Sequence, residues 1–144
     1  MATPTSGYAK ILDQDSQKLS SDTRGKVGYV NEEHTLPNWM AVEKVVAMQK
    51  HFYSKWNENT YQKVIGFFDV DPKQGVSGLS RGERAGFNLS MALAQSPEIL
   101  ILDEPTSAVD YESERGVQAG LTAICEQGNM TAIIIAHRLT TIRN

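Results

Sequence analysis

The sequence predicts an α/β fold in which strands near both ends of the chain flank a helical segment. Short apolar runs occupy residues 26–30, 99–102 and 131–136, and each has the length of a strand. Between the first two runs, apolar residues recur at the spacing of helices. A further helical pattern separates the last two runs, and the order strand, helix, strand is typical of a right-handed parallel crossover.

Composition narrows the class of protein. A chain of 144 residues is long enough for one domain with a hydrophobic core. The formal net charge of −3 does not favour a nucleic-acid partner, which would require a basic patch. The longest aliphatic runs are far too short to span a bilayer, so a role at a membrane would require a partner. The one cysteine fits a reducing compartment.

The individual elements are expected in the following order. A short strand lies around Tyr8–Leu12, and a second strand at Lys26–Val30 follows the polar stretch 20–25. Three helices follow. The apolar face of the first is Val42, Val45, Val46 and Gln49, and that of the second is Tyr61, Val64, Ile65 and Phe68. The third helix is expected to start near Ser80 and to run to about Ala94. The runs Ile99–Leu102 and Thr131–Ala136 are expected to be strands buried on both faces, separated by a helix with Val117, Leu121, Ile124 and Cys125 on its apolar side.

Two carboxylates follow the predicted strand Ile99–Leu102. Ligands of α/β folds bind at the carboxyl ends of the strands, which is where Asp103 and Glu104 are expected. Asp103 is suited to hold Mg²⁺, which prefers oxygen ligands. Glu104 is suited to polarise an attacking water as a general base. An acidic turn in solvent before Pro105 explains the pair equally well.

The segment LSRGE, residues 79–83, combines two features of a helix start. Ser80 and Glu83 have the spacing of a capping box. Gly82 allows close approach to the backbone, and the amides of a helix N-terminus bind phosphate. The two interpretations are compatible, and a simple cap is the commoner one for such a segment taken alone.

His137 follows the predicted strand Thr131–Ala136. This strand is expected beside Ile99–Leu102, which would bring His137 to the same edge of the sheet, within reach of a γ-phosphate and the attacking water. A single histidine after a strand is usually only a polar end to that strand.

Together, LSRGE, ILILDEPTSAVD and IIIAHR make the sequence resemble the nucleotide-binding subunit of ABC transporters. The resemblance implies a partial P-loop NTPase core, residues 1–31 and 97–144, with an inserted helical subdomain, residues 32–96. Segment 56–73 is similar to the helical subdomain of ABC-2-type exporters. The cofactors implied are ATP and Mg²⁺.

The resemblance also assigns roles to single residues. The implied nucleotide-binding residues are Ser80, Gly82, Glu83, Glu32 and Asp110, the implied metal ligand is Asp103, and the implied catalytic residues are Glu104 and His137. Glu32 stands where the family's Q-loop carries glutamine, and Asp110 belongs to the D-loop. The implied partners are a second nucleotide-binding domain in a head-to-tail dimer and a transmembrane permease, which would place the chain at the cytoplasmic side of a membrane. Phe52, Tyr53 and Trp56 could line the permease groove, although packing within the helical subdomain is the commoner role of such rings.

The phosphate-binding pattern G-x-x-x-x-G-K-[ST] does not occur in the 144 residues. Backbone amides and a lysine of that loop supply much of the grip on the phosphates. We therefore expect this chain to be a fragment of a longer ATPase and to be inactive alone. Two alternative functions remain open from the sequence: a soluble ABC-type ATPase acting in translation or on DNA, and a non-catalytic remnant that acts as a binding module.

Overall fold

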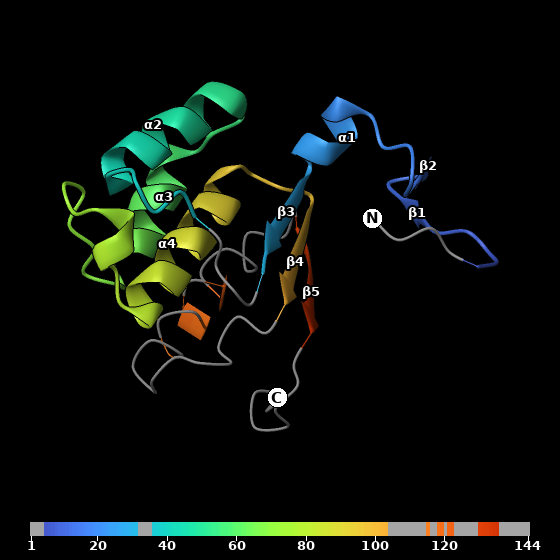
Figure 1. The fold of residues 1–144 in the computed structure, drawn as a ribbon. Coiled ribbons are helices and arrows are strands. Elements are labelled where there is room, and N and C mark those ends of the chain that lie inside the picture. The colour runs from blue at the N-terminus through green and yellow to red at the C-terminus, as the bar shows by residue number, and fades with distance from the viewer. Residues whose placement is uncertain are drawn as a thin grey trace.

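The computed structural model describes residues 5–31, 36–103, 115, 118–119, 121–122 and 130–135. In chain order the elements are β1 (Lys10–Ile11), β2 (Gln14–Asp15), α1 (Ser21–Gly25), β3 (Val27–Val30), α2 (Val42–Phe52), α3 (Glu58–Ile65), the 3₁₀ helix η1 (Val76–Gly78), α4 (Arg81–Ala94), β4 (Ile99–Asp103) and β5 (Thr131–Ile135). Helices α2 to α4 form a layer on one side of a sheet made of β3, β4 and β5 (Figure 1). No helix in the described part of the chain is long and apolar enough to cross a membrane.

The sheet confirms the parallel arrangement expected from the sequence. Its strand order is β3-β4-β5, and both pairs are parallel, with Val27 opposite Ile99 and Ile99 opposite Thr131. Gly28 allows close packing at the start of β3, because a Cβ atom there would lie 2.9 Å from Cδ1 of Leu100. The register therefore brings the carboxyl ends of the three strands to one edge.

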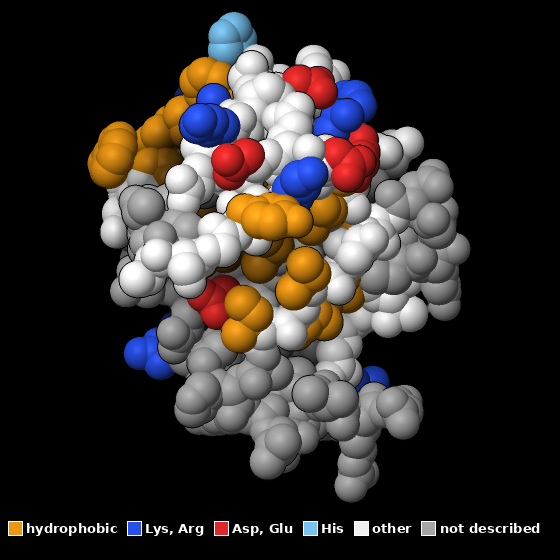
Figure 2. Space-filling view, turned by 90° about the vertical axis from the view of Figure 1, so that its right-hand side faces the viewer, with side chains coloured by type: hydrophobic (Ala, Val, Ile, Leu, Met, Phe, Trp, Pro, Cys, Tyr) orange, Lys and Arg blue, Asp and Glu red, His pale blue; other side chains and the backbone are white. Residues whose placement is uncertain are grey.

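The expectation that strands Ile99–Leu102 and Thr131–Ala136 are buried on both faces is wrong. In β4 only Leu100 and Leu102 are fully buried, on the face that packs against α4. In β5 the side chains of Ile133, Ile134 and Ile135 are 49–51% exposed. A parallel strand is buried twice only when elements cover both faces of the sheet, which an apolar run by itself cannot guarantee. Figure 2 shows the molecule from the side of the sheet, and apolar side chains (orange) gather in the middle of this face.

Helix α4 is the centre of the packing. Its side chains Leu89, Ala92 and Leu93 join a core with Leu100 and Leu102 of the sheet. Its other side joins a second core with α2, α3 and η1, made of Val42, Val45, Val46, Tyr61, Val76, Leu79, Phe87, Met91 and Ala94. Helices α2 and α3 thus follow the predicted apolar faces closely, α4 has the predicted extent, and α4 holds the helical layer to the sheet.

The N-terminal segment differs from the prediction. Instead of one strand over Tyr8–Leu12, the chain forms an antiparallel hairpin, with Lys10 opposite Asp15. Leu12 and Asp13 have φ of 48° and 64°, the left-handed values of a two-residue hairpin turn. Such turns usually contain glycine or asparagine, so Leu-Asp gave no turn signal.

The polar stretch 20–25 also gains structure, as the short helix α1. Ser20 caps it, because the Ser20 Oγ accepts a hydrogen bond from the amide of Thr23 at 3.1 Å. The division into a core (1–31 and 97–144) and a helical subdomain (32–96) stays a prediction.

Candidate functional site

Asp103 lies where the sequence predicts it, at the carboxyl end of the central strand β4. Its carboxylate meets Tyr29 of β3, whose Oη donates a hydrogen bond to Oδ2 of Asp103 at 3.3 Å. Partial burial of the phenol and, next, the negative charge of Asp103 raise the pKa of Tyr29. The phenol therefore stays protonated at neutral pH and remains a donor to this carboxylate.

This arrangement is compatible with a magnesium site. Mg²⁺ is usually bound by one or two carboxylates, with water and substrate phosphates completing the coordination. Asp103 supplies a carboxylate that is only partly buried, and the hydrogen bond of Tyr29 engages one of its two oxygens. Among the described residues there is no group of three or more side chains that could ligate a metal.

LSRGE forms the start of α4 as a capping box. Oγ of Ser80 accepts a hydrogen bond from the amide of Glu83 at 3.2 Å, and the amide of Ser80 donates to Oε2 of Glu83 at 2.7 Å. Ser80 is exposed, whereas Gly82 is buried. The carboxylate of Glu83 is thus engaged with the backbone of its own chain, whereas Ser80 and Arg81 are exposed to solvent at this helix start.

The structure brings together Ser80, Gly82 and Glu83 on one helix turn and places Asp103 on the sheet. Four further residues predicted from the sequence, Glu32, Glu104, Asp110 and His137, lie outside the described residues. The assignment of roles to all eight residues stays a prediction.

Sequence reasoning missed Tyr29 and Arg84. The pairing of Tyr29 with Ile101 puts its ring on the same face of the sheet as Asp103, two residues farther along β4. That relation could have been found by aligning the two predicted strands. Arg84 donates hydrogen bonds to Asn38 and to the carbonyl of Val76, which lie 46 and 8 residues away. No local pattern indicates such partners.

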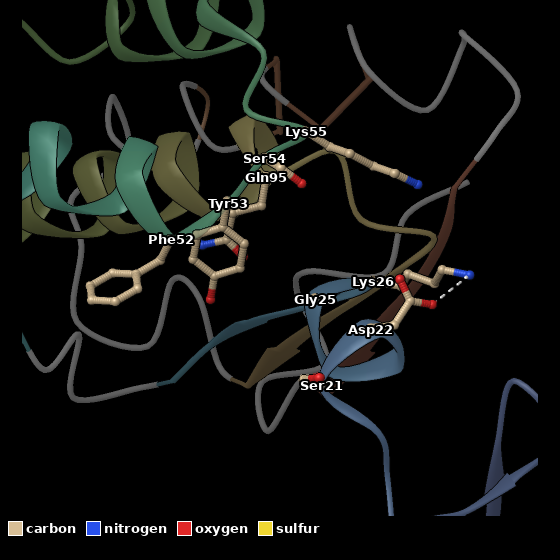
Figure 3. A pocket seen from close by; sticks show the side chains of 9 residues that line it. All are labelled: Ser21, Asp22, Gly25, Lys26, Phe52, Tyr53, Ser54, Lys55 and Gln95. Atoms are coloured by element: carbon tan, nitrogen blue, oxygen red, sulfur yellow. Dashed lines mark ion pairs between the residues drawn. The ribbon is translucent and has the colours of Figure 1, made fainter.

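A small polar cavity lies away from both predicted sites. It has a volume of about 150 Å³ and lies between the end of α2 and the helix α1 (Figure 3). On its wall Lys26 pairs with Asp22 at 3.4 Å. This negative charge and, next, that of Glu98 raise the pKa of Lys26. Lys26 therefore stays protonated, and its positive charge is compensated by the carboxylates of Asp22 and Glu98.

A larger groove of about 480 Å³ runs between α2 and α3. Val42, Val46 and Tyr61 form apolar parts of its wall, and Lys50 and Glu58 form an ion pair of 2.7 Å in it. The Lys50 ammonium and the Gln62 amide lower the pKa of Glu58 to about 2, in spite of partial burial. Burial and, next, the charge of Glu58 raise the pKa of Tyr61 to about 12.

The aromatic side chains near the groove have different roles. The ring of Trp56 lies 5.6 Å from that of Tyr61 and packs against the helical core. Phe52 is 71% exposed. Packing therefore accounts for Trp56, whereas the ring of Phe52 remains available at the surface.

Comparison with known proteins places this geometry in a family. The profile of the family described as ABC transporter matches residues 1–107. The chain belongs to the ABC transporter family. This membership and the observed sheet and helices confirm the predicted α/β ATPase-type fold.

Two curated relatives of this ABC transporter chain illustrate the likeness. The leukotoxin export ATP-binding protein LtxB of Aggregatibacter actinomycetemcomitans is 38% identical over 139 residues, which cover 93% of this chain and 17% of the relative. The alpha-hemolysin translocation ATP-binding protein HlyB of Escherichia coli O157:H7 is 35% identical over 137 residues, which cover 84% of this chain and 18% of the relative. The chain thus spans less than a fifth of the length of either relative.

Among solved structures, a dimeric ATP-binding cassette, MJ0796, in a post-hydrolysis state bound to ADP and Pi has a TM-score of 0.79. The match has 19% sequence identity and covers 97% of this chain and 66% of the cassette. At this identity the likeness shows the fold of the ABC chain alone.

Proposed function

We propose that this chain is part of the ATP-binding and ATP-hydrolysing cassette of an ABC transporter and couples ATP hydrolysis to transport across a membrane. The observation that carries the proposal is the position of Asp103 at the carboxyl end of the central parallel strand. In α/β folds this edge binds the ligand. The relatives named for leukotoxin export and alpha-hemolysin translocation support a role in export.

On this proposal, Asp103 would hold Mg²⁺, which neutralises phosphate charge when bound with ATP. Tyr29 orients the Asp103 carboxylate through the hydrogen bond to Oδ2. Glu104, the next residue, would accept a proton from the attacking water as general base. His137 would contact the γ-phosphate and help to orient that water. Glu32 and Asp110 would complete the nucleotide site from neighbouring loops.

Ser80 would act on a different nucleotide, held by a second cassette. Its hydroxyl and the first amides of α4 form a partly positive helix end, which attracts phosphate. The reciprocal bonds with Glu83 fix the conformation of Ser80 before any ligand arrives. Glu83 would therefore support the site through the backbone, and Gly82 would allow the phosphate to approach the backbone closely. For Ser80 to contact a nucleotide held by a second cassette, the two cassettes would have to pair head to tail.

The groove between α2 and α3 is our proposed contact for the membrane-embedded permease. It combines apolar walls with charged groups. The exposed ring of Phe52 lines the small cavity at the end of α2 and is not part of this groove. An exposed apolar surface bordered by polar side chains is typical of an interaction site. The permease would hold the chain at the cytoplasmic side of the membrane.

A chimera tests the proposal. This chain would replace the segment with which it aligns in the leukotoxin export ATP-binding protein, and ATP hydrolysis would be measured with Mg²⁺. We expect an active chimera in which Ser80→Arg and Glu104→Gln each lower turnover about 100-fold. Ser54→Arg, at an exposed serine between α2 and α3, serves as control and should leave turnover unchanged. An active chimera that tolerates both Ser80→Arg and Glu104→Gln would contradict the proposal.

A further inference from the structure

Arg84 occupies an unusual position for a side chain in the second turn of a helix. Its guanidinium donates through Nη1 to Oδ1 of Asn38 at 2.8 Å and through Nη2 to the carbonyl oxygen of Val76 at 2.7 Å. Asn38 precedes α2, and Val76 begins η1, the turn that leads into LSRGE. One side chain of α4 therefore holds two other segments of the chain at once.

The two segments that Arg84 holds are also bound to each other. The amide of Val76 donates to the carbonyl of Met40 at 2.9 Å, and the amide of Val42 donates to the carbonyl of Gln74 at 3.0 Å. A further bond, from Nε2 of Gln74 to the carbonyl of Gly78 at 2.8 Å, closes the turn internally. The backbone from η1 to Ser80 is thus fixed against the start of α2, and Arg84 supplies the connection from α4.

We propose that Arg84 is a positioning residue that sets the direction in which η1 delivers Ser80 to the start of α4. The purpose of this positioning rests on the proposed function, because it matters only if Ser80 faces a nucleotide. The cap at Ser80 requires extended backbone, with φ −61° and ψ 168°. Leu79, just before it, is buried in the helical core. The approach of η1 therefore decides whether the hydroxyl of Ser80 points out of the helix in its capping geometry.

The chemistry of arginine suits this task. A guanidinium is planar and presents donors in a fixed fork, so two acceptors in different segments are bound with one defined geometry. A lysine ammonium at the same place is a point charge on a flexible stem and does not fix the angle between its partners. The bond to the Val76 carbonyl is partly buried, which limits competition from water.

Amide hydrogen exchange of the 144-residue chain, followed by NMR, tests the proposal without any nucleotide. The reporters are the amides of Gly78, Leu79 and Glu83, which are bonded within η1 and the cap. The reference amides are those of Ile99 and Thr131, which are bonded in the sheet region. We expect Arg84→Gln to speed exchange of the reporters about tenfold or more, with the reference amides changed less than twofold. In Arg84→Lys the reporter amides should recover less than half of the protection that Arg84→Gln loses, with protection expressed as the logarithm of the exchange rate.

Arg81→Gln is the matched control, because Arg81 is an exposed arginine at the start of the same helix. It should leave every rate unchanged. Asn38→Ala removes one acceptor without altering α4 and should loosen the same reporters. In the double variant Asn38→Ala/Arg84→Gln, the reporters should exchange no faster than in Arg84→Gln alone, because both changes remove one shared connection. If Arg84→Gln speeds all amides equally, or none, the proposal is wrong. Neither result would depend on ATP turnover by the chimera, so the two proposals fail separately.

Discussion

Gly86 is a position in α4 where one added methyl group should be costly. A Cβ atom there would lie 2.1–2.4 Å from three carbon atoms of the Phe68 ring, compared with at least 3.4 Å for ordinary contact. The ring would have to move by about 1.3 Å, but it is only 7% exposed and belongs to the core between α3, α4 and the sheet. Overpacking of this kind costs roughly 1–3 kcal/mol, and the better helix propensity of alanine returns up to about 1 kcal/mol. We expect Gly86→Ala to lower the free energy of unfolding by about 2 kcal/mol, since so severe an overlap falls at the upper end of that range.

Urea unfolding followed by circular dichroism measures this loss as a lower midpoint at constant slope. Gly25→Ala is the matched control, because a Cβ at this helical glycine meets nothing within 4 Å, and its midpoint should be unchanged or slightly higher. In a Phe68→Leu background, Gly86→Ala should cost less, because the smaller side chain leaves room for the methyl group. A Gly86→Ala chain as stable as the parent, or an equal cost in both backgrounds, would refute the reasoning from the Phe68 contact.

Substitutions at three other positions give sharp outcomes. Ser80→Ala should lower the free energy of unfolding by about 1 kcal/mol through loss of the cap. Ser80→Asp keeps a good cap and should preserve the stability. In the chimera, however, Ser80→Asp should abolish ATP turnover, because the new carboxylate brings negative charge to a phosphate. Glu58→Gln should lower the free energy of unfolding by less than about 1 kcal/mol at pH 7, since the Glu58 carboxylate is 45% exposed. Folding lowers the pKa of Glu58 from 4.5 to about 2, so the contribution of this carboxylate to the free energy of unfolding is complete above pH 4.5. Unfolding curves recorded at successive pH values should show the stability difference between Glu58→Gln and the parent shrinking as pH falls toward 2. Tyr29→Phe should change the free energy of unfolding by no more than about 0.5 kcal/mol, because the hydrogen bond to Asp103 is long and exposed. Urea unfolding measures this change.

The elements that local pattern determines were predictable. The capping spacing of Ser80 and Glu83 located the start of α4, and the run ILIL located β4 and the position of Asp103. Both signals act over a few residues, so no tertiary information is needed to interpret them. The helical faces of α2 and α3 are of the same kind, because helical periodicity directly states which side is buried.

What failed depended on contacts between distant segments. The exposure of Ile133, Ile134 and Ile135 depends on which elements cover the sheet, and an aliphatic run carries no information about that cover. The two acceptors of Arg84 come from other segments, so its role looked like that of any surface arginine. The hairpin turn at Leu12 and Asp13 lacked the residues that usually mark such turns.

Ser80 and Asp103, which would contribute to two different nucleotide sites, are related through the short connection between α4 and β4. Helix α4 ends at Ala94 and β4 begins at Ile99, and the chain reverses its direction between them (Figure 1). The carbonyl of Ala92, near the end of α4, indeed lies close to Gly28 at the start of β3. The start of α4 and the end of β4 therefore point to the same end of the molecule (Figure 1). Because the side chains of α4 pack rigidly on Leu100 and Leu102, a displacement of α4 should reach both Ser80 and Asp103. A change at Gly86 would then disturb both residues together, although Gly86 lies six residues from Ser80 and on a different element from Asp103.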